Sequence, residues 1–145
     1  MSKYLQFDEL EITDQQLLVT ALEEDMTFRG AGRSAVVESF ASPQHLFGFG
    51  GDQRPETAEV IVRRQFVGSA ANDLGFKRQE SGNFRPIISA YDSRFYNAAW
   101  LDELSQRYGE RRFIQEMHES GYMLSNKSAI ADGSTEMSFV AMGAI

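Results

Sequence analysis

Residue types that commonly perform chemistry are present in the chain, but they lack the spacing of a catalytic or metal-binding motif. Residues 30–34 (GAGRS) resemble the end of a phosphate-binding loop, yet Thr27 and Arg33 stand where that motif requires glycine and lysine. His45 and His118 have no companion at metal-ligand spacing. No serine or carboxylate is grouped with a base in a catalytic pattern. We therefore expect a non-enzymatic protein without a metal or cofactor.

Positively charged and aromatic side chains are the better candidates, and they indicate binding. Residues 58–94 hold six basic side chains against four acidic ones, whereas residues 1–26 hold one against seven. The net charge of the whole chain is -7, which argues against a nucleic-acid partner. The basic segment is either a solvated edge of a sheet or a face for an acidic partner or a phosphate-bearing ligand. The candidate residues are Arg63, Lys77, Arg78 and Arg85 for charge, Phe49 for stacking and Trp100, if exposed, as an anchor for a protein partner.

Strand geometry limits the size of any basic face. Neighbouring residues of a strand point to opposite faces, so Arg63 lies opposite Arg64 and Lys77 lies opposite Arg78. At most half of each pair can share a face. The predicted patch is therefore small.

The candidate cations lie in the segment with the strongest strand signals. Residues 60–62 (VIV) are a β-branched run, and residues 74–79 and 83–91 read as two arms of a hairpin around a turn of glycine and polar residues. Pro86 cannot donate a ladder hydrogen bond, which predicts a bulge or an edge in the second arm.

Two helical regions and a second hairpin complete the predicted elements. A helix should begin at Thr13, with the spacing of a capping box, and end near Asp25. A second helical region covers residues 95–120, where the apolar stripe shifts near Gly109 as if two helices met or one helix bent there. The final hairpin turns at residues 132–133 (DG), and its last strand reads as buried on both faces.

This order of elements predicts an α+β fold, in which an antiparallel sheet has helices packed on one face. A ferredoxin-like core with additions is the more specific expectation. The length of 145 residues suits a single domain. Five of the 12 glycines fall within residues 27–57, which predicts a glycine-rich insertion or loop there, although residues 34–40 (SAVVESF) could form a short strand. Within it, residues 47–51 (FGFGG) either let backbone approach a ligand beside Phe49 or form a turn packed on the sheet.

Composition also limits the cellular compartments in which the protein is expected. The chain has no cysteine, so it has no disulfide framework, and no apolar run is long enough for a membrane helix. The first residues are acidic and lack the apolar core of a signal peptide. We expect a cytoplasmic protein, or one of an equivalent internal compartment such as the plastid stroma or a host cytoplasm.

Several short stretches resemble a known family. They are residues 58–64 (AEVIVRR), 73–78 (DLGFKR), 104–108 (LSQRY), 121–122 (GY) and 132–133 (DG), together with residues 2–4 and the helix at 12–24. In these stretches the chain resembles the conserved-hypothetical chloroplast reading-frame (Ycf-type) proteins of red-algal plastids and cyanobacteria, with relatives in phages. Lys3 replaces a histidine of that family, and residues 27–46 look like an insertion or a diverged loop.

The resemblance implies an uncharacterised family whose genes often lie beside AAA+ ATPases. It therefore implies an accessory to a larger machine. Our leading hypothesis is a binding or adaptor domain that acts through a protein partner. One alternative is a binder of a nucleotide or other phosphate-bearing ligand, and another is a structural subunit of a virion or other assembly.

Overall fold

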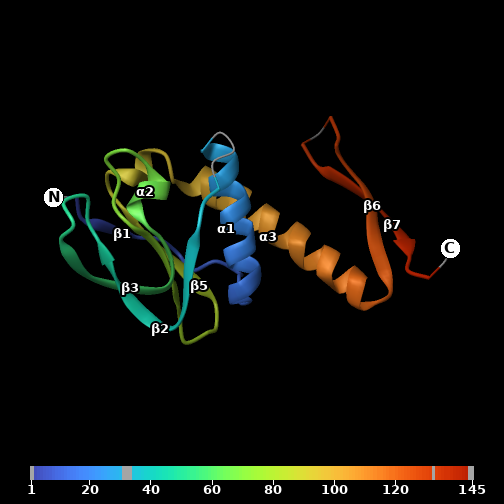
Figure 1. The fold of residues 1–145 in the computed structure, drawn as a ribbon, viewed down its shortest axis with the longest axis horizontal. Helices are drawn as coiled ribbons and strands as arrows, with labels where there is room; N and C mark the ends of the chain where they lie inside the picture. The colour runs from blue at the N-terminus through green and yellow to red at the C-terminus, as the bar shows by residue number, and fades with distance from the viewer. Residues whose placement is uncertain (1, 31–33, 132, 144–145) are drawn as a thin grey trace. The chain divides into compact units, whose positions relative to one another are not determined.

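The chain is organised in two compact units. The computed structural model describes residues 2–30, 34–131 and 133–143, and it divides into an N-terminal unit, Met1–Tyr108, and a C-terminal unit, Gly109–Ile145 (Figure 1). The division falls within one helix, so that helix contributes residues to both units. Each unit is described separately below.

The N-terminal unit is built on a five-stranded antiparallel sheet in the order β1-β5-β4-β3-β2. Strands β2 to β5 form a meander, and β1 pairs with the outer edge of β5. The predicted antiparallel α+β fold is therefore confirmed, but the meander differs from the split βαβ units of a ferredoxin-like core. The strands are β1 (Tyr4–Gln6), β2 (Val37–Phe47), β3 (Gln53–Val62), β4 (Leu74–Arg78) and β5 (Phe84–Ser89).

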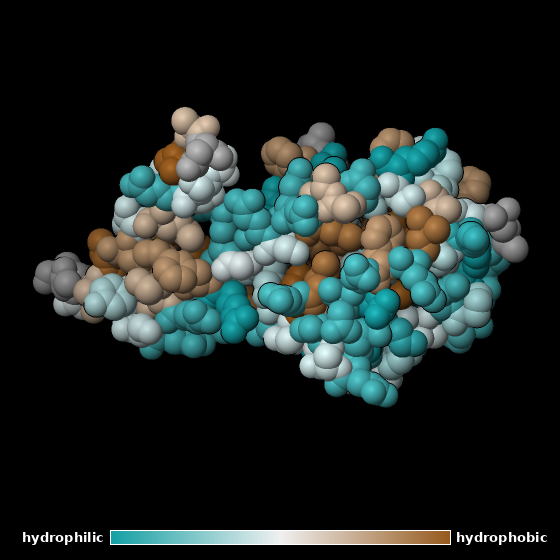
Figure 2. All heavy atoms as spheres, turned by 180° about the vertical axis from the view of Figure 1, so that it is seen from behind, coloured by the Kyte–Doolittle hydropathy of each residue, from teal (hydrophilic) through white to brown (hydrophobic). Residues whose placement is uncertain are grey.

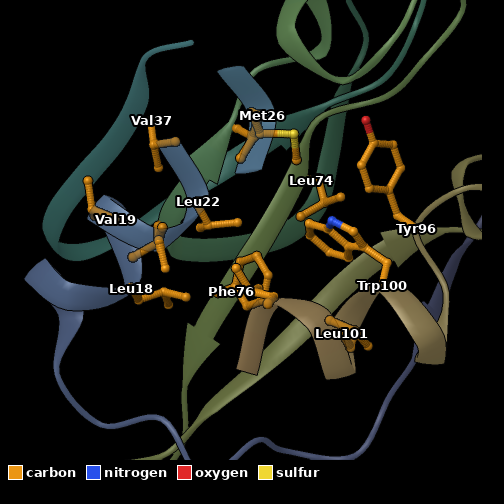
Figure 3. Close-up of a cluster of buried hydrophobic side chains, with 14 of the residues drawn as sticks. Leu18, Val19, Leu22, Met26, Val37, Leu74, Phe76, Tyr96, Trp100 and Leu101 are labelled. Atoms are coloured by element: carbon orange, nitrogen blue, oxygen red, sulfur yellow. The ribbon is translucent and has the colours of Figure 1, made fainter. Parts of the chain in front are cut away.

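Helices cover one face of this sheet and form the main core (Figure 3). Leu18 and Leu22 of α1 (Gln15–Arg29) and Trp100 of α3 (Ala98–Glu119) pack with Leu74 and Phe76 of the sheet. The helix-free face carries a smaller apolar cluster. Its buried members are Leu46, Ala58 and Ile61, with Tyr4, Phe40 and Ile87 packed against them.

Strands β2 and β3 occupy most of the segment that was expected to be a glycine-rich loop. The short strand that the sequence allowed at residues 34–40 forms the start of β2. The loop expectation is wrong for the rest of Val37–Phe47 and for the start of Gln53–Val62, which pair as a long antiparallel hairpin with irregular register. The glycines at 48, 50 and 51 make its connection, and Gly51 has a φ of 80°. The phosphate-loop-like residues 31–33 lie outside the described residues.

The β4–β5 hairpin follows its sequence signals closely. Gly82 in the connection has a φ of 90°, as a tight turn requires, and Phe76 pairs with Pro86 without a register shift. Of the two predicted alternatives at Pro86, the bulge is absent and the edge is present. The last pair of the β1–β5 ladder is Gln6–Ile87, so β1 does not extend to Pro86. Pro86 is therefore tolerated, because no backbone N–H is required from it on that side.

The N-terminal elements differ from prediction at their ends. Strand β1 has only three residues, and Leu10 makes an isolated bridge to Phe84. Helix α1 is capped by Asp14, whose side chain accepts from the backbone N–H of Leu17, so the predicted Thr13 capping box is wrong. The helix continues to Arg29 rather than ending near Asp25, because Asp25 and Met26 are buried in the core. Two short helical segments complete the unit: α2 (Arg64–Val67) lies between β3 and β4, and η1 (Asp92–Arg94) lies between β5 and α3.

The C-terminal unit consists of the end of α3 and the hairpin β6 (Tyr122–Ala129) and β7 (Thr135–Ala141). These two strands form a separate sheet. The prediction that the last strand is buried on both faces is wrong: β7 alternates between half-buried and exposed residues. The turn glycine, Gly133, has a φ of 86°, and Asp132 before it lies outside the described residues. Among the described residues, no helix is long and apolar enough to cross a membrane.

Helix α3 passes through Gly109 as one continuous helix, so the expected meeting of two helices is wrong. The shift of the apolar stripe has a different cause. Leu104 and Tyr108 pack in the N-terminal unit, whereas Phe113 contacts Phe139 of the C-terminal hairpin. The stripe shifts because the two halves of the helix pack against different elements.

We expect Gly109→Ala to stabilise the protein by about 0.5–1 kcal/mol, because alanine lowers the entropy of the unfolded chain in a helix interior. A Cβ at this position meets no atom within 4 Å. Urea denaturation measures the change. Gly121→Ala is the control and should destabilise by about 1 kcal/mol or more, because Gly121 has a φ of 94°. Destabilisation by Gly109→Ala would show that the helix needs a glycine there.

Candidate functional site

Three of the four predicted cations line one groove of the N-terminal unit. Lys77, Arg78 and Arg85 contribute to a cavity of about 610 Å³. The other lining residues come from β1, β3, β5 and the β4–β5 connection: Tyr4, Leu5, Gln6, Glu56, Gln79, Glu80 and Ile87. We call this cavity the Lys77 groove.

Lys77 and Arg85 form the charged part of the groove. The β4–β5 register places them directly opposite each other across the two strands. Phe76 belongs to the helix-covered core, so strand alternation puts Lys77 and Arg85 on the helix-free face. Lys77 donates to the Thr57 hydroxyl at 2.9 Å. Arg85 donates to the Phe7 carbonyl at 3.0 Å and to the Gln79 side chain at 3.3 Å.

Arg78 lines the groove, but its guanidinium is used on the other face of the sheet. The group donates to the carbonyls of Thr13 and Gly82 at 3.0 and 2.9 Å, and it lies 4.4 Å from the centre of the Phe84 ring. Phe84 belongs to the helix-covered core. The groove therefore has two cationic groups, as the predicted alternation of Lys77 and Arg78 requires.

Glu56 supplies a carboxylate to the same groove. Its Oε1 atom is buried and has no hydrogen-bond partner among the described residues. Tyr4 of β1 also lines this groove. Its hydroxyl donates a hydrogen bond to the backbone carbonyl of Asp73 at 2.5 Å. Burial first, and then the charge of Asp73, raises the pKa of Tyr4 well above its usual range, so the phenol stays protonated and keeps this hydrogen bond.

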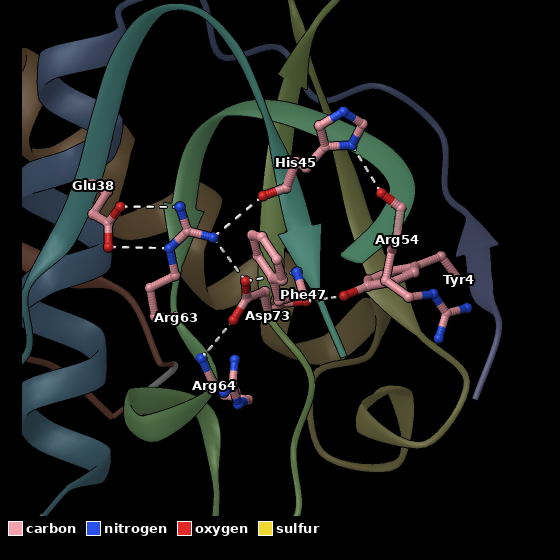
Figure 4. A network of polar contacts seen from close by, with 8 residues as sticks. All are labelled: Tyr4, Glu38, His45, Phe47, Arg54, Arg63, Arg64 and Asp73. Atoms are coloured by element: carbon pink, nitrogen blue, oxygen red, sulfur yellow. Dashed lines mark hydrogen bonds and ion pairs between the residues drawn. The ribbon is translucent and has the colours of Figure 1, made fainter. Parts of the chain in front are cut away.

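Arg63, the fourth predicted cation, lies outside the Lys77 groove and is held in a polar network (Figure 4). It forms ion pairs with Glu38 at 3.0 Å and with the buried carboxylate of Asp73 at 2.8 Å. Burial alone would lower the pKa of Arg63, but its hydrogen bonds to these two carboxylates outweigh burial and raise it. Arg63 therefore connects β2, β3 and the start of β4.

Phe49 is exposed and lines a different cavity. This second cavity, of about 580 Å³, also contains Tyr91, Arg54 and Asp52. Arg54 lies 3.7 Å from Asp52 and 5.4 Å from the centre of the Tyr4 ring, so its charge is already balanced. The structure therefore does not bring Phe49 together with the predicted cations.

Trp100 is in the core rather than on the surface, with 1% of its area exposed. Its indole N–H donates to the buried carboxylate of Asp25 at 2.7 Å, and its ring meets the edge of Tyr96 at 4.9 Å. Trp100 therefore cannot be the exposed partner anchor that the sequence left open.

The two cavities present charged, polar and aromatic side chains. The buried Ser89 hydroxyl donates to Asp92, which also accepts from the backbone N–H of Asn72, so both groups are used within the protein. Among the described residues, no group of three or more histidine, aspartate or glutamate side chains is placed to hold a metal. Two adjacent cations beside a cavity can hold an anion.

Sequence reasoning missed Tyr4, Glu56 and the pairing of Lys77 with Arg85. The pairing had a usable signal, because a hairpin centred on residue 81 places 77 opposite 85. Glu56 fell in a segment that was expected to be a loop. The long-range contact between Tyr4 and Asp73 has no local signal.

The structure has an α+β fold with two cavities in its N-terminal unit. Residues 36–138 match the family described as "Protein of unknown function (DUF1257)", and the chain belongs to this family. The expected membership of an uncharacterised family is thereby confirmed. The match begins within the segment that was expected to be an insertion or diverged loop and includes both β2 and β3. No curated protein and no solved structure matches the chain.

Proposed function

We propose that the protein is a non-enzymatic adaptor that binds a protein partner through its C-terminal unit. The observation that carries this proposal is the absence of a buried residue among the described residues 109–131 and 133–143. Large apolar side chains are instead exposed on this unit, as the space-filling view shows (Figure 2). They are Phe113, Tyr122, Met123, Ile130, Val140 and Met142.

The two faces of the β6–β7 hairpin differ in their partners. On one face Phe139 packs against Phe113 at 5.5 Å, and Lys127 pairs with Glu110 at 2.6 Å, so this face meets α3. On the other face Met123 lies directly opposite Val140, and they are 50% and 48% exposed. We call this second side of the hairpin the outer face.

A protein partner would bury the apolar side chains that this unit leaves exposed. A two-stranded hairpin is marginally stable by itself, and a unit of fewer than about 40 residues usually needs a disulfide, a metal or association. The chain has no cysteine. Covering Met123 and Val140 with apolar side chains would contribute up to about 1.5–3 kcal/mol for each of them.

The resemblance supports a more specific version of the proposal. We propose that the chain is a Ycf-type member of its family, from a plastid, a cyanobacterium or a phage, and that it works in the corresponding internal compartment. The AAA+ ATPases encoded beside such genes are then the first candidates for the partner. The adaptor would be accessory to that machine.

The test is the double variant Met123→Ser, Val140→Ser, with capture of a neighbouring ATPase as the measurement. We expect recovery of the partner to fall at least tenfold, because two apolar contacts are lost, while the melting temperature stays within about 2 °C because both side chains are exposed. The matched control is the swap Asn126→Ser, Ser138→Asn, on another directly paired position of the same face.

Three results would contradict the adaptor proposal. One is equal recovery of the partner by the double variant and the control. Another is a large symmetric assembly in light scattering of the purified protein, which would support a structural subunit. The third is turnover of a nucleotide or ester by the protein alone.

A further inference from the structure

The β4–β5 register brings together two cations, neither of which forms an ion pair with a carboxylate of the described residues. Lys77 and Arg85 lie directly opposite each other, and like charges in that position destabilise a sheet. Their hydrogen bonds go to a hydroxyl, an amide side chain and a backbone carbonyl, all of which are neutral. Within the part of the chain that the structure describes, no carboxylate lies within ion-pair distance of either group.

Two arginines of the same unit show the contrasting arrangement, in which carboxylates balance the charge. Arg63 pairs with Glu38 and Asp73, and Arg29 pairs with Asp25 and Glu103. The repulsion between Lys77 and Arg85 therefore lowers the stability of the folded protein. An anion between them would remove that cost and gain two charge-assisted hydrogen bonds.

The surroundings define the size and charge of such an anion. The Lys77 groove has a volume of about 610 Å³, within the range of small-molecule sites. Tyr4 and Ile87 line it and also pack on the apolar cluster of the helix-free face, so they present a surface for a ring or an alkyl group. The carboxylates of Glu56 and Glu80 line the same groove and would repel a polyanion.

We propose that the Lys77 groove binds a small organic anion, in which a phosphate monoester or carboxylate lies between Lys77 and Arg85 and an apolar body lies on Tyr4 and Ile87. The site belongs to the N-terminal unit and is independent of the outer face of the C-terminal hairpin. The nearby carboxylates disfavour a polyphosphate or a nucleic acid. Arg63 and Phe49 take no part.

Four probes distinguish the components of this recognition. Phenyl phosphate, benzoate and benzyl alcohol share one ring and differ in the head group, and ATP adds further negative charge. Isothermal titration calorimetry measures each dissociation constant. We expect phenyl phosphate or benzoate to bind at least tenfold more tightly than benzyl alcohol and more tightly than ATP. The stronger of the two anions identifies phosphate or carboxylate as the natural head group.

Variants test the two cations. Lys77→Gln and Arg85→Gln should each weaken binding of the preferred anion at least tenfold. The control is Arg112→Gln, which also removes one positive charge, but from the C-terminal unit, and it should leave binding unchanged. Without ligand, Lys77→Gln should keep or raise the melting temperature, because a like-charge contact is removed. This separates loss of a site from loss of the fold.

The proposal would be overturned by any of three outcomes. The first is no binding of either phenyl phosphate or benzoate at millimolar concentration. The second is an equal effect of Arg112→Gln and Lys77→Gln, which would indicate unspecific charge. The third is a lowered melting temperature of unliganded Lys77→Gln, which would show that this cation is structural. None of these results bears on the adaptor function, which is tested on the other unit.

Discussion

Asp73→Ala is expected to lower the free energy of unfolding by about 3–5 kcal/mol, because it removes a buried charge on which three donors depend. The side chain is fully buried and accepts from the backbone N–H groups of Phe47 and Arg64, each at 2.8 Å. It also pairs with Arg63 at 2.8 Å (Figure 4). Alanine would remove the acceptor of two part-buried backbone donors and the partner of Arg63.

Arg63 provides the matched control for this prediction, because its second carboxylate partner is much more exposed. Glu38 has 38% of its side chain accessible, so Glu38→Gln should cost no more than about 1 kcal/mol. Urea denaturation followed by the fluorescence of Trp100, the one tryptophan of the chain, measures both variants. Similar costs for the two variants would show that the Asp73 network does not hold the sheet together.

The position of Asp73 explains why we expect so large an effect. It precedes β4, yet its partners lie at the end of β2 and just after β3, and its own carbonyl accepts from Tyr4 of β1. One residue therefore connects segments that are far apart in sequence. Its loss should loosen the β2–β3 hairpin before it affects the helices.

Trp100→Ala should also destabilise the protein by about 3–5 kcal/mol, because it leaves a large cavity under the helix-covered face of the sheet. The indole packs near Phe76 and against the edge of Tyr96. Trp100→Phe is the informative second variant. It keeps a ring but removes the donor to Asp25, and we expect a cost of about 1.5–3 kcal/mol.

Far-UV circular dichroism during urea denaturation measures these variants, because the fluorescent residue itself is replaced. Phe49→Ala is the control, since this ring is 61% exposed and its loss should change stability by no more than about 0.5 kcal/mol. If Trp100→Ala cost as little as Phe49→Ala, the indole would not be part of the core. Neither Trp100 variant should change anion binding, provided that it is measured on folded protein.

The accuracy of the sequence-based predictions followed the range of the interactions involved. The β4–β5 hairpin, the Gly133 turn and the helical region ending before Gly121 were all predicted from residues within a few positions of each other. Turns and caps are local, so local sequence contains their signal. The full length of the β2–β3 hairpin was missed, although short strands were indicated at residues 34–40 and 60–62, because its irregular register breaks the alternation of apolar and polar residues.

Candidate site residues were predicted by type but not by grouping. Lys77 and Arg85 share a groove, whereas Arg63 is neutralised by Glu38 and Asp73 and Trp100 is buried. Residue type shows that a side chain carries charge. It does not show whether a carboxylate from a distant strand already balances that charge.

By itself, the sequence determined the α+β class, the central hairpin and the small number of cations that one face could hold. Strand alternation and turn chemistry are properties of neighbouring residues, and they need no knowledge of the rest of the chain. Only the tertiary structure decided that Lys77 and Arg85 form no ion pair with a carboxylate of the described residues, and that the final hairpin leaves Met123 and Val140 exposed. Burial and charge balance depend on which distant segments pack together, and the separation of the chain into two units is a result of that packing.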